Sequence, residues 1–151
     1  MSHLSKVILL ATGIFYPEVG GPAIHVRNIA EGLLDDGWEP VVLTYSLSTN
    51  PDNFHFKVVR IGAKYPKIIR WFIYATKAFL ITRKSRLVYA FDLTAAGIPA
   101  FVSAKTFGKK FLIRIGGDPI WERVVEEGKR FVSLLEYYKN GFHLADKPLL
   151  F

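Results

Sequence analysis

A pair of glycines near the N-terminus has the residue types and the position expected of an anion-binding loop. Gly20 and Gly21 end a loop in front of Pro22, and His25 follows three residues later. Proline suits the first turn of a helix, so a helix is expected to begin here. Paired glycines let a ligand approach the backbone, and the free N–H groups of a helix start attract an anion. We therefore predict an anion-binding loop. The alternative for Gly20 and Gly21 is an ordinary turn, and the alternative for His25 is a packed surface histidine.

A second group of polar residues follows two later apolar runs. Asp92 comes directly after the run that ends at Phe91, and Arg114 lies near the end of another run. Arg114 could meet a phosphate or form a surface ion pair. Each of Asp92 and Asp118 could cap the helix expected after it, and a ligand-binding role is equally open for Asp118. Glu122 lies one helical turn after Asp118 and could share a face with it, or be a surface glutamate.

The composition indicates one folded domain of 151 residues with a substantial core. Half of the residues are hydrophobic, which excludes disordered and collagen-like classes. The chain has no cysteine and only four scattered histidines, so we predict neither a disulfide nor a metal site. The apolar run after Lys6 is too short for a signal peptide, and no apolar stretch is long enough to span a bilayer. These features predict a cytoplasmic protein, or one held peripherally on the inner face of the membrane.

Strand-like apolar runs and helix-like patterns alternate along the chain. The expected strands are residues 7–12, 41–45, 56–61, 87–91 and 110–115. One helix is expected to begin at Pro22, and the other expected helices are residues 67–84, 94–107, 120–128 and 131–140. This alternation predicts an α/β fold with a Rossmann-like, doubly wound, mostly parallel sheet of order 3-2-1-4-5 and helices on both faces. Ligands collect where the first and fourth strands end in that order, so residues 13–21 and 91–94 should meet there, next to the end of strand five.

Two of the helices have a predicted apolar side. The helix that begins at Pro22 should end at Gly37, and its apolar side is formed by Ile24, Ile29, Leu33 and Leu34. In the helix Lys67–Lys84, one side carries Ile68, Phe72, Ala75 and Phe79, and the other carries Lys67, Arg70, Lys77 and Lys84. This pattern fits an ordinary core-facing helix, and it equally fits a helix at an anionic membrane surface.

Positive charge is concentrated in the middle of the chain. Residues 60 to 114 contain twelve Lys or Arg and one acid, Asp92, whereas the rest of the chain has eight basic and twelve acidic residues. Such a segment indicates a polyanionic partner, namely a membrane surface, a phosphorylated substrate or nucleic acid, or else a solvated basic surface. Because the basic residues are interleaved with apolar runs and form no recognition motif, nucleic acid is the partner that we expect least.

Two stretches resemble a known enzyme family. The first runs from Ile8 through Phe15, Tyr16, Pro17, Gly20, Gly21, His25, Ile29, Ala30, Leu33, Gly37 and Trp38 to Val41–Thr44; the second runs from Phe111 through Arg114, Gly116, Gly117, Asp118 and Trp121 to Glu122. Together they resemble the N-terminal half of retaining GT-B glycosyltransferases of family four. The start of the second strand departs from the family pattern, since Trp38, Glu39 and Pro40 stand there.

The resemblance implies an activity and roles for individual residues. Residues 1–151 would form a single acceptor-side domain of an enzyme that transfers a hexose from a UDP- or GDP-sugar to a sugar or lipid-linked acceptor hydroxyl, with retention of configuration. Gly20 and Gly21 would lie under the donor diphosphate or line the cleft between domains. Asp118 best matches the catalytic polar residue that contacts the transferred sugar. The remaining substrate-binding candidates are His25, Asp92, Arg114, Gly117 and Glu122.

The resemblance also implies what the chain lacks. Family members bind the nucleotide through a second Rossmann-like domain with an E-x7-E acidic pair, and we find no copy of that pair. The 151 residues alone are expected to have little activity, and no cofactor or catalytic metal beyond the nucleotide-sugar donor is expected. The alternative is a non-catalytic Rossmann-like binding domain or subunit that recognises an anionic partner. A dinucleotide-dependent enzyme is not indicated, because the G-x-G-x-x-G motif and an acid at the end of strand two are absent.

Overall fold

The structure, a computed structural model, describes residues 6–18, 20–46, 53–62, 64–116, 125 and 133–139. The chain divides into two units, Met1–Gly116 and Gly117–Phe151. In the second unit, the described helix is α5 (Leu134–Lys139). All of the features below belong to the first unit.

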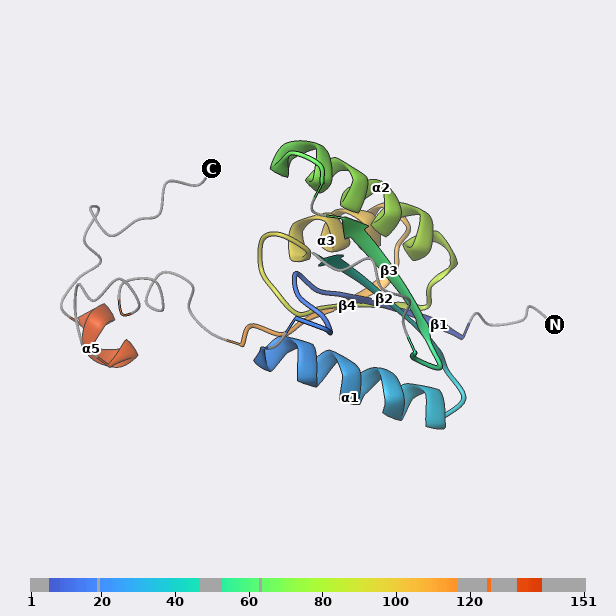
Figure 1. The fold of residues 1–151 in the computed structure, drawn as a ribbon, viewed down its shortest axis with the longest axis horizontal. Helices are drawn as coiled ribbons and strands as arrows, with labels where there is room; N and C mark the ends of the chain where they lie inside the picture. Colours follow the sequence, from blue (N-terminus) through green and yellow to red (C-terminus); the bar gives the residue numbers. More distant parts are fainter. Residues whose placement is uncertain are drawn as a thin grey trace. The chain divides into compact units, whose positions relative to one another are not determined.

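The first unit is built on a five-stranded sheet in which every neighbouring pair is parallel. The strands are β1 (Val7–Ala11), β2 (Glu39–Ser46), β3 (Lys57–Gly62), β4 (Leu87–Ala90) and β5 (Lys110–Ile113), in the order β3-β2-β1-β4-β5. One face of the sheet is covered by α1 (Gly21–Asp35), and the other face by α2 (Lys67–Lys84) and α3 (Gly97–Thr106) (Figure 1). The predicted α/β, Rossmann-like fold and its strand order are confirmed.

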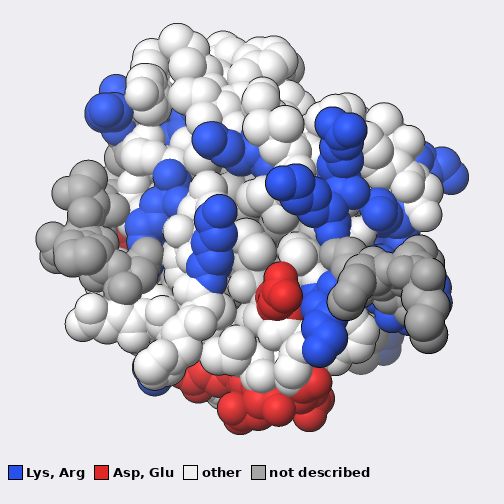
Figure 2. Space-filling model, turned by 90° about the vertical axis from the view of Figure 1, so that its right-hand side faces the viewer, with Lys and Arg blue, Asp and Glu red and all other residues white. Residues whose placement is uncertain are grey.

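Several basic residues of the central segment lie where the strands begin and the helices end, together with Lys6 and Lys57. This amino edge of the sheet carries Lys6, Lys57, Arg83, Lys84, Arg86, Lys105 and Lys110. Figure 2 looks onto this edge and shows Lys and Arg over its upper and middle parts, with most of the Asp and Glu at the bottom. The acids here include Asp35 and Asp36 at the end of α1. The cations in the last turns of α2 and α3 are favourable there, because the C-terminal end of a helix carries partial negative charge.

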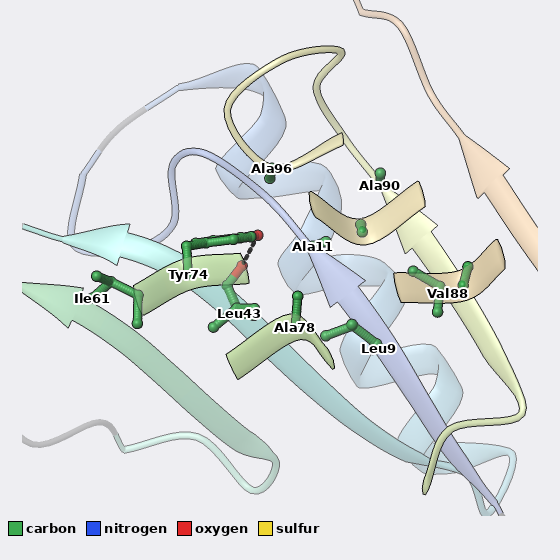
Figure 3. Close-up of a cluster of buried hydrophobic side chains, with 11 residues drawn as sticks. Leu9, Ala11, Leu43, Ile61, Tyr74, Ala78, Val88, Ala90 and Ala96 are labelled. Atoms are coloured by element: carbon green, nitrogen blue, oxygen red, sulfur yellow. Dashed lines mark hydrogen bonds between the residues drawn. The ribbon is translucent and has the colours of Figure 1, made fainter. Parts of the chain in front are cut away.

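The sheet separates two hydrophobic cores. Because side chains alternate along a strand, Leu9 and Ala11 of β1 face α2 and α3, whereas Ile8 and Leu10 face α1. The largest fully buried side chain is Tyr74 of α2, which lies in the first core (Figure 3). Both faces of β1 are therefore buried, as its continuous aliphatic run predicts.

Local chemistry sets the helix ends. Gly37 has a φ of +75°, which favours glycine, and its N–H donates to the carbonyl of Leu34, so the predicted end of α1 is confirmed. Helix α3 begins at Gly97 and not at Thr94, which corrects the prediction. The carboxylate of Asp92 accepts hydrogen bonds from the N–H groups of Ala96 (2.8 Å) and Gly97 (3.3 Å), so the chain forms a turn before the helix starts.

The predicted core-facing side was wrong for α2 and only partly right for α1, in which Ile29 and Leu33 pack against the second core. In α2 the buried residues are Tyr74, Ala78 and Thr82, whereas Ile68 is 73% exposed and Phe72 is 61% exposed. In α1 the buried residues are Ala23, Val26 and Ala30, and Ile24 is exposed. Small residues on the buried sides, such as Ala23 and Ala30 of α1 and Ala78 of α2, let the helices approach the sheet closely, and Tyr74 fills the first core. Between α2 and α3, for example, the hydroxyls of Thr82 and Ser103 form a buried 3.0 Å hydrogen bond.

Candidate functional site

The candidate site lies at the carboxyl edge of the sheet, where β1 and β4 end side by side. The chain leaves β1 towards β2 and leaves β4 towards β5, so the connections diverge between these two strands. The strand ends are aligned by backbone hydrogen bonds from Phe91 to Ala11 (2.9 Å) and from Arg114 to Ala90 (2.8 Å). The predicted meeting of the ends of strands one, four and five is confirmed. In open parallel sheets, this divergence is where ligands bind.

Asp92 lies at this point, and within the described part of the chain only one of its two carboxylate oxygens forms a hydrogen bond. Its Oδ1 accepts hydrogen bonds from the first N–H groups of α3 and so stabilises the start of that helix, although the N-cap residue is Ala96. Its Oδ2 is buried and has no hydrogen-bond partner among the described residues. A side chain at Gly13, the second residue after β1, would place its Cβ 3.1 Å from Oδ2, so glycine leaves room for the carboxylate. Buried polar atoms in folded proteins are nearly always paired, and this oxygen could accept a hydrogen bond from a ligand hydroxyl.

Two tyrosines near Asp92 were not singled out from the sequence. The rings of Tyr45 and Tyr74 stack with centroids 4.6 Å apart. The hydroxyl of Tyr45 donates to the carbonyl of Ala95, and that of Tyr74 donates to the carbonyl of Leu43, each at 3.0 Å. Burial, and then the negative charge of Asp92, raise the pKa of Tyr45 to about 12 and the pKa of Tyr74 well above its usual value. Both hydroxyls are therefore neutral donors at physiological pH.

Replacing Tyr45 with phenylalanine should reduce the loss of stability at alkaline pH. The unfolded tyrosine ionises near pH 10, about two units below the folded one, so a rise from about pH 10 to about pH 12 favours the unfolded chain. Urea unfolding across this range should show a smaller decline in the free energy of unfolding for Tyr45→Phe than for the unmodified chain. Tyr65→Phe, which changes an exposed tyrosine, is the control. Identical declines in the unmodified chain and in Tyr45→Phe would contradict the assigned pKa.

Hydrogen bonds and an ion pair connect the loop between β1 and α1 to β2 and β3. Arg60 donates to the hydroxyl of Ser46 (3.2 Å) and to the carbonyl of Tyr16, and that hydroxyl donates to Glu18 (2.9 Å). Arg60 and Glu18 also form an ion pair at 3.9 Å. Within the loop, Phe15 is fully buried. The sequence contains a signal for this network, because Arg60 interrupts the apolar residues of β3, but nothing in the sequence identifies its partners.

His25 and Arg114, predicted separately as ligand-binding residues, lie in direct contact. The guanidinium Nη2 of Arg114 lies 3.1 Å from His25 Nε2, and with His25 neutral and protonated at Nδ1 the guanidinium donates this bond. The contact joins the first turns of α1 to the residue that follows β5. Within the described part of the chain, neither residue forms an ion pair with a carboxylate. The positive charge of Arg114 is therefore available to an anion at the start of α1.

The fold itself does not require glycine at the predicted pair. Gly20 has an extended backbone with a φ of 173°, which any residue adopts, and a Cβ there would make ordinary contact with Ile14 at 3.5 Å. A Cβ at Gly21 would meet nothing within 4 Å. The first backbone bond of α1 runs from Ile24 to Gly20, and the N–H groups before it have no acceptor within the helix. Neither internal packing nor backbone strain therefore explains the two glycines, whereas close approach by a ligand would.

Three predicted site residues, Gly117, Asp118 and Glu122, lie outside the described residues. Among the residues that the structure describes, no group of three His, Cys, Asp or Glu side chains could hold a metal ion. The same part of the chain contains no helix with the length and apolar character needed to cross a bilayer. No model of a known protein family matches the chain, and no curated protein matches it at a significant level.

Proposed function

We propose that the first unit is the acceptor-side half of a GT-B glycosyltransferase. The complete enzyme would transfer a hexose from a UDP- or GDP-sugar to a sugar or lipid-linked acceptor hydroxyl, with retention of configuration. The observation that best supports this proposal is the contact between His25 and Arg114. It brings together one residue from each of the two stretches that resemble the family, and these two residues are 89 positions apart in the sequence.

The geometry supports different roles for different residues of the site. The start of α1 at Gly20 and Gly21 would receive the donor diphosphate, because helix N–H groups and the Arg114 guanidinium both stabilise negative charge. This stabilisation matters most in the transition state, when charge develops on the leaving phosphate. The Oδ2 oxygen of Asp92 would accept a hydrogen bond from a sugar hydroxyl. Contact with the transferred sugar is assigned to Asp118 by the family resemblance alone, because Asp118 lies outside the described residues. The nucleotide would be held mainly by a second domain.

Replacing Arg114 with alanine should lower kcat/KM for hexose transfer about 100-fold, because a donor to the leaving phosphate is lost. The assay is transfer of radiolabelled hexose from UDP- and GDP-sugars by the native polypeptide isolated from its source cells, compared with the same polypeptide carrying each substitution. Arg114→Lys should recover part of the activity, because it restores the charge without the planar guanidinium. Lys57→Ala, which removes a cation at the opposite edge of the sheet, is the matched control and should leave transfer unchanged.

Three results would overturn the proposal. The first is an Arg114→Ala variant as active as the unmodified enzyme. The second is a native polypeptide that transfers no hexose from either class of donor. The third is a native polypeptide that binds pyrophosphate through His25 and Arg114 but has no transferase activity, which would indicate a non-catalytic domain for an anionic partner.

A further inference from the structure

The outward side of the α2–α3 layer carries a row of large apolar side chains. Five lie on α2 and three on α3, and each is between 42% and 73% exposed: Ile68, Ile69, Phe72, Phe79, Leu80, Ile98, Phe101 and Val102. We call these eight residues the outer apolar surface. Contiguous exposed apolar surface of this kind marks an interaction site in soluble proteins.

The core does not need these side chains, because other residues dock the two helices. Tyr74, Ala78 and Thr82 face inward from α2, and Ala100, Ser103 and Ala104 face inward from α3. The helices lie side by side on one face of the sheet (Figure 1), so their outward sides form one surface. The ring of Phe79 packs 4.4 Å from that of Phe107, which continues the surface from α2 to the end of α3.

The charge around this surface has a single sign. Neither α2 nor α3 contains an acidic residue, and exposed cations flank the apolar side chains: Lys67, Lys77, Arg83, Lys84 and Lys105. Further cations lie at the adjoining amino edge of the sheet, where Figure 2 shows Lys and Arg beneath the uncharged top of the molecule. Apolar side chains at the centre and cations at the periphery are the composition of a helical surface that lies in an anionic membrane interface.

We propose that the outer apolar surface binds peripherally to an anionic lipid bilayer. The apolar side chains would enter the boundary between headgroups and acyl chains, and the flanking cations would meet lipid phosphates and carboxylates. A second copy of the same surface fits less well, because a symmetric pairing would oppose cations to cations with no acid between them. This inference is independent of the glycosyltransferase proposal, since it uses neither His25 nor Arg114.

The test is co-sedimentation of the whole chain with vesicles. Vesicles of phosphatidylcholine that contain phosphatidylglycerol should bind the chain at low salt, and binding should weaken as salt is raised. Vesicles of phosphatidylcholine alone should bind it at least about tenfold more weakly. Ile69→Ser with Phe72→Ser should weaken binding to the anionic vesicles about tenfold or more, because both apolar side chains are removed. Lys77→Glu with Arg83→Glu should weaken it about fivefold or more for each cation reversed.

Matched controls locate the binding surface. Ile24→Ser with Arg27→Glu changes one exposed apolar residue and one partly exposed cation of α1, on the other face of the sheet, and it should bind like the unmodified chain. Unchanged urea midpoints should confirm that every variant is folded. The proposal is overturned by absence of sedimentation with anionic vesicles at low salt, or by equal losses in the control variant. It is also overturned if the chain forms a dimer that Phe72→Ser disrupts and the vesicles bind nothing.

Discussion

Replacing Tyr74 with alanine should lower the free energy of unfolding of the first unit by about 3–5 kcal/mol. Tyr74 is fully buried between α2 and the sheet (Figure 3). Its ring also stacks on that of Tyr45. Truncation would remove this packing, leave a cavity in the core and take away a hydrogen bond to the carbonyl of Leu43. Urea unfolding followed by circular dichroism would measure the loss.

Two variants separate the contributions to this loss. Tyr74→Phe keeps the ring and removes the hydroxyl, so it should cost about 1 kcal/mol. Phe72→Ala, two residues away on the exposed side of α2, should change stability by about 0.5 kcal/mol or less. If Phe72→Ala were as destabilising as Tyr74→Ala, the orientation of α2 described above would be wrong.

Gly97→Val should destabilise the unit by about 3 kcal/mol, because it introduces a clash that side-chain rotation cannot relieve. A Cβ at Gly97 would lie 2.2 Å from the backbone carbonyl oxygen of Asp92. Either the start of α3 or the turn at Asp92 must therefore move. Urea unfolding would again give the magnitude, and the variant should also weaken any ligand binding that depends on the position of Asp92.

Gly32 provides the control for this substitution. It lies inside α1, where a Cβ would meet nothing within 4 Å, so Gly32→Ala should raise the free energy of unfolding by about 0.5–1 kcal/mol. If Gly97→Val lowers the free energy of unfolding and Gly32→Ala raises it, the contact with Asp92, and not the loss of a glycine in general, determines the effect at Gly97. A stable Gly97→Val variant would contradict the close approach of α3 to Asp92.

The parts of the fold that depend on local sequence were predictable. The aliphatic run of β1 indicates a strand buried on both faces, and strands alternating with helices indicate parallel crossovers. The order 3-2-1-4-5 was adopted as the Rossmann-like arrangement, and the structure has it. Gly37 and Asp92 also acted as expected, because helix ends depend on a few neighbouring residues.

The side of α2 that faces the core was not predictable from periodicity alone. A helical repeat tells which residues share a side, and here one side carries Ile68 and Phe72 while another carries Ala78 and Thr82. The choice between them depends on how closely α2 must approach α3, which is a property of the assembled layer. The same limit applies to Gly97, whose neighbour within clashing distance is known only once the turn before α3 is folded.

The location of the candidate site was predictable from the sequence, whereas the contacts between its residues were only partly predictable. Strand order alone brings the ends of β1, β4 and β5 together, and His25 and Arg114 were each selected on residue type and position. Their contact depends on the angle at which α1 leaves the sheet, which no sequence pattern specifies. The tyrosine pair was missed because an aromatic residue near a strand end, such as Tyr45, or within a helix, such as Tyr74, is ordinarily part of the core.

The burial of both faces of β1 has a consequence for how this protein can be altered by evolution or by engineering. Substitutions at Leu9 or Leu10 each affect one core, because neighbouring side chains point to opposite faces. An insertion or deletion of one residue would instead exchange the two sets of side chains and misalign both cores at once. The central strand therefore accepts changes in residue type far more readily than changes in length, and the loops must absorb nearly all variation in length.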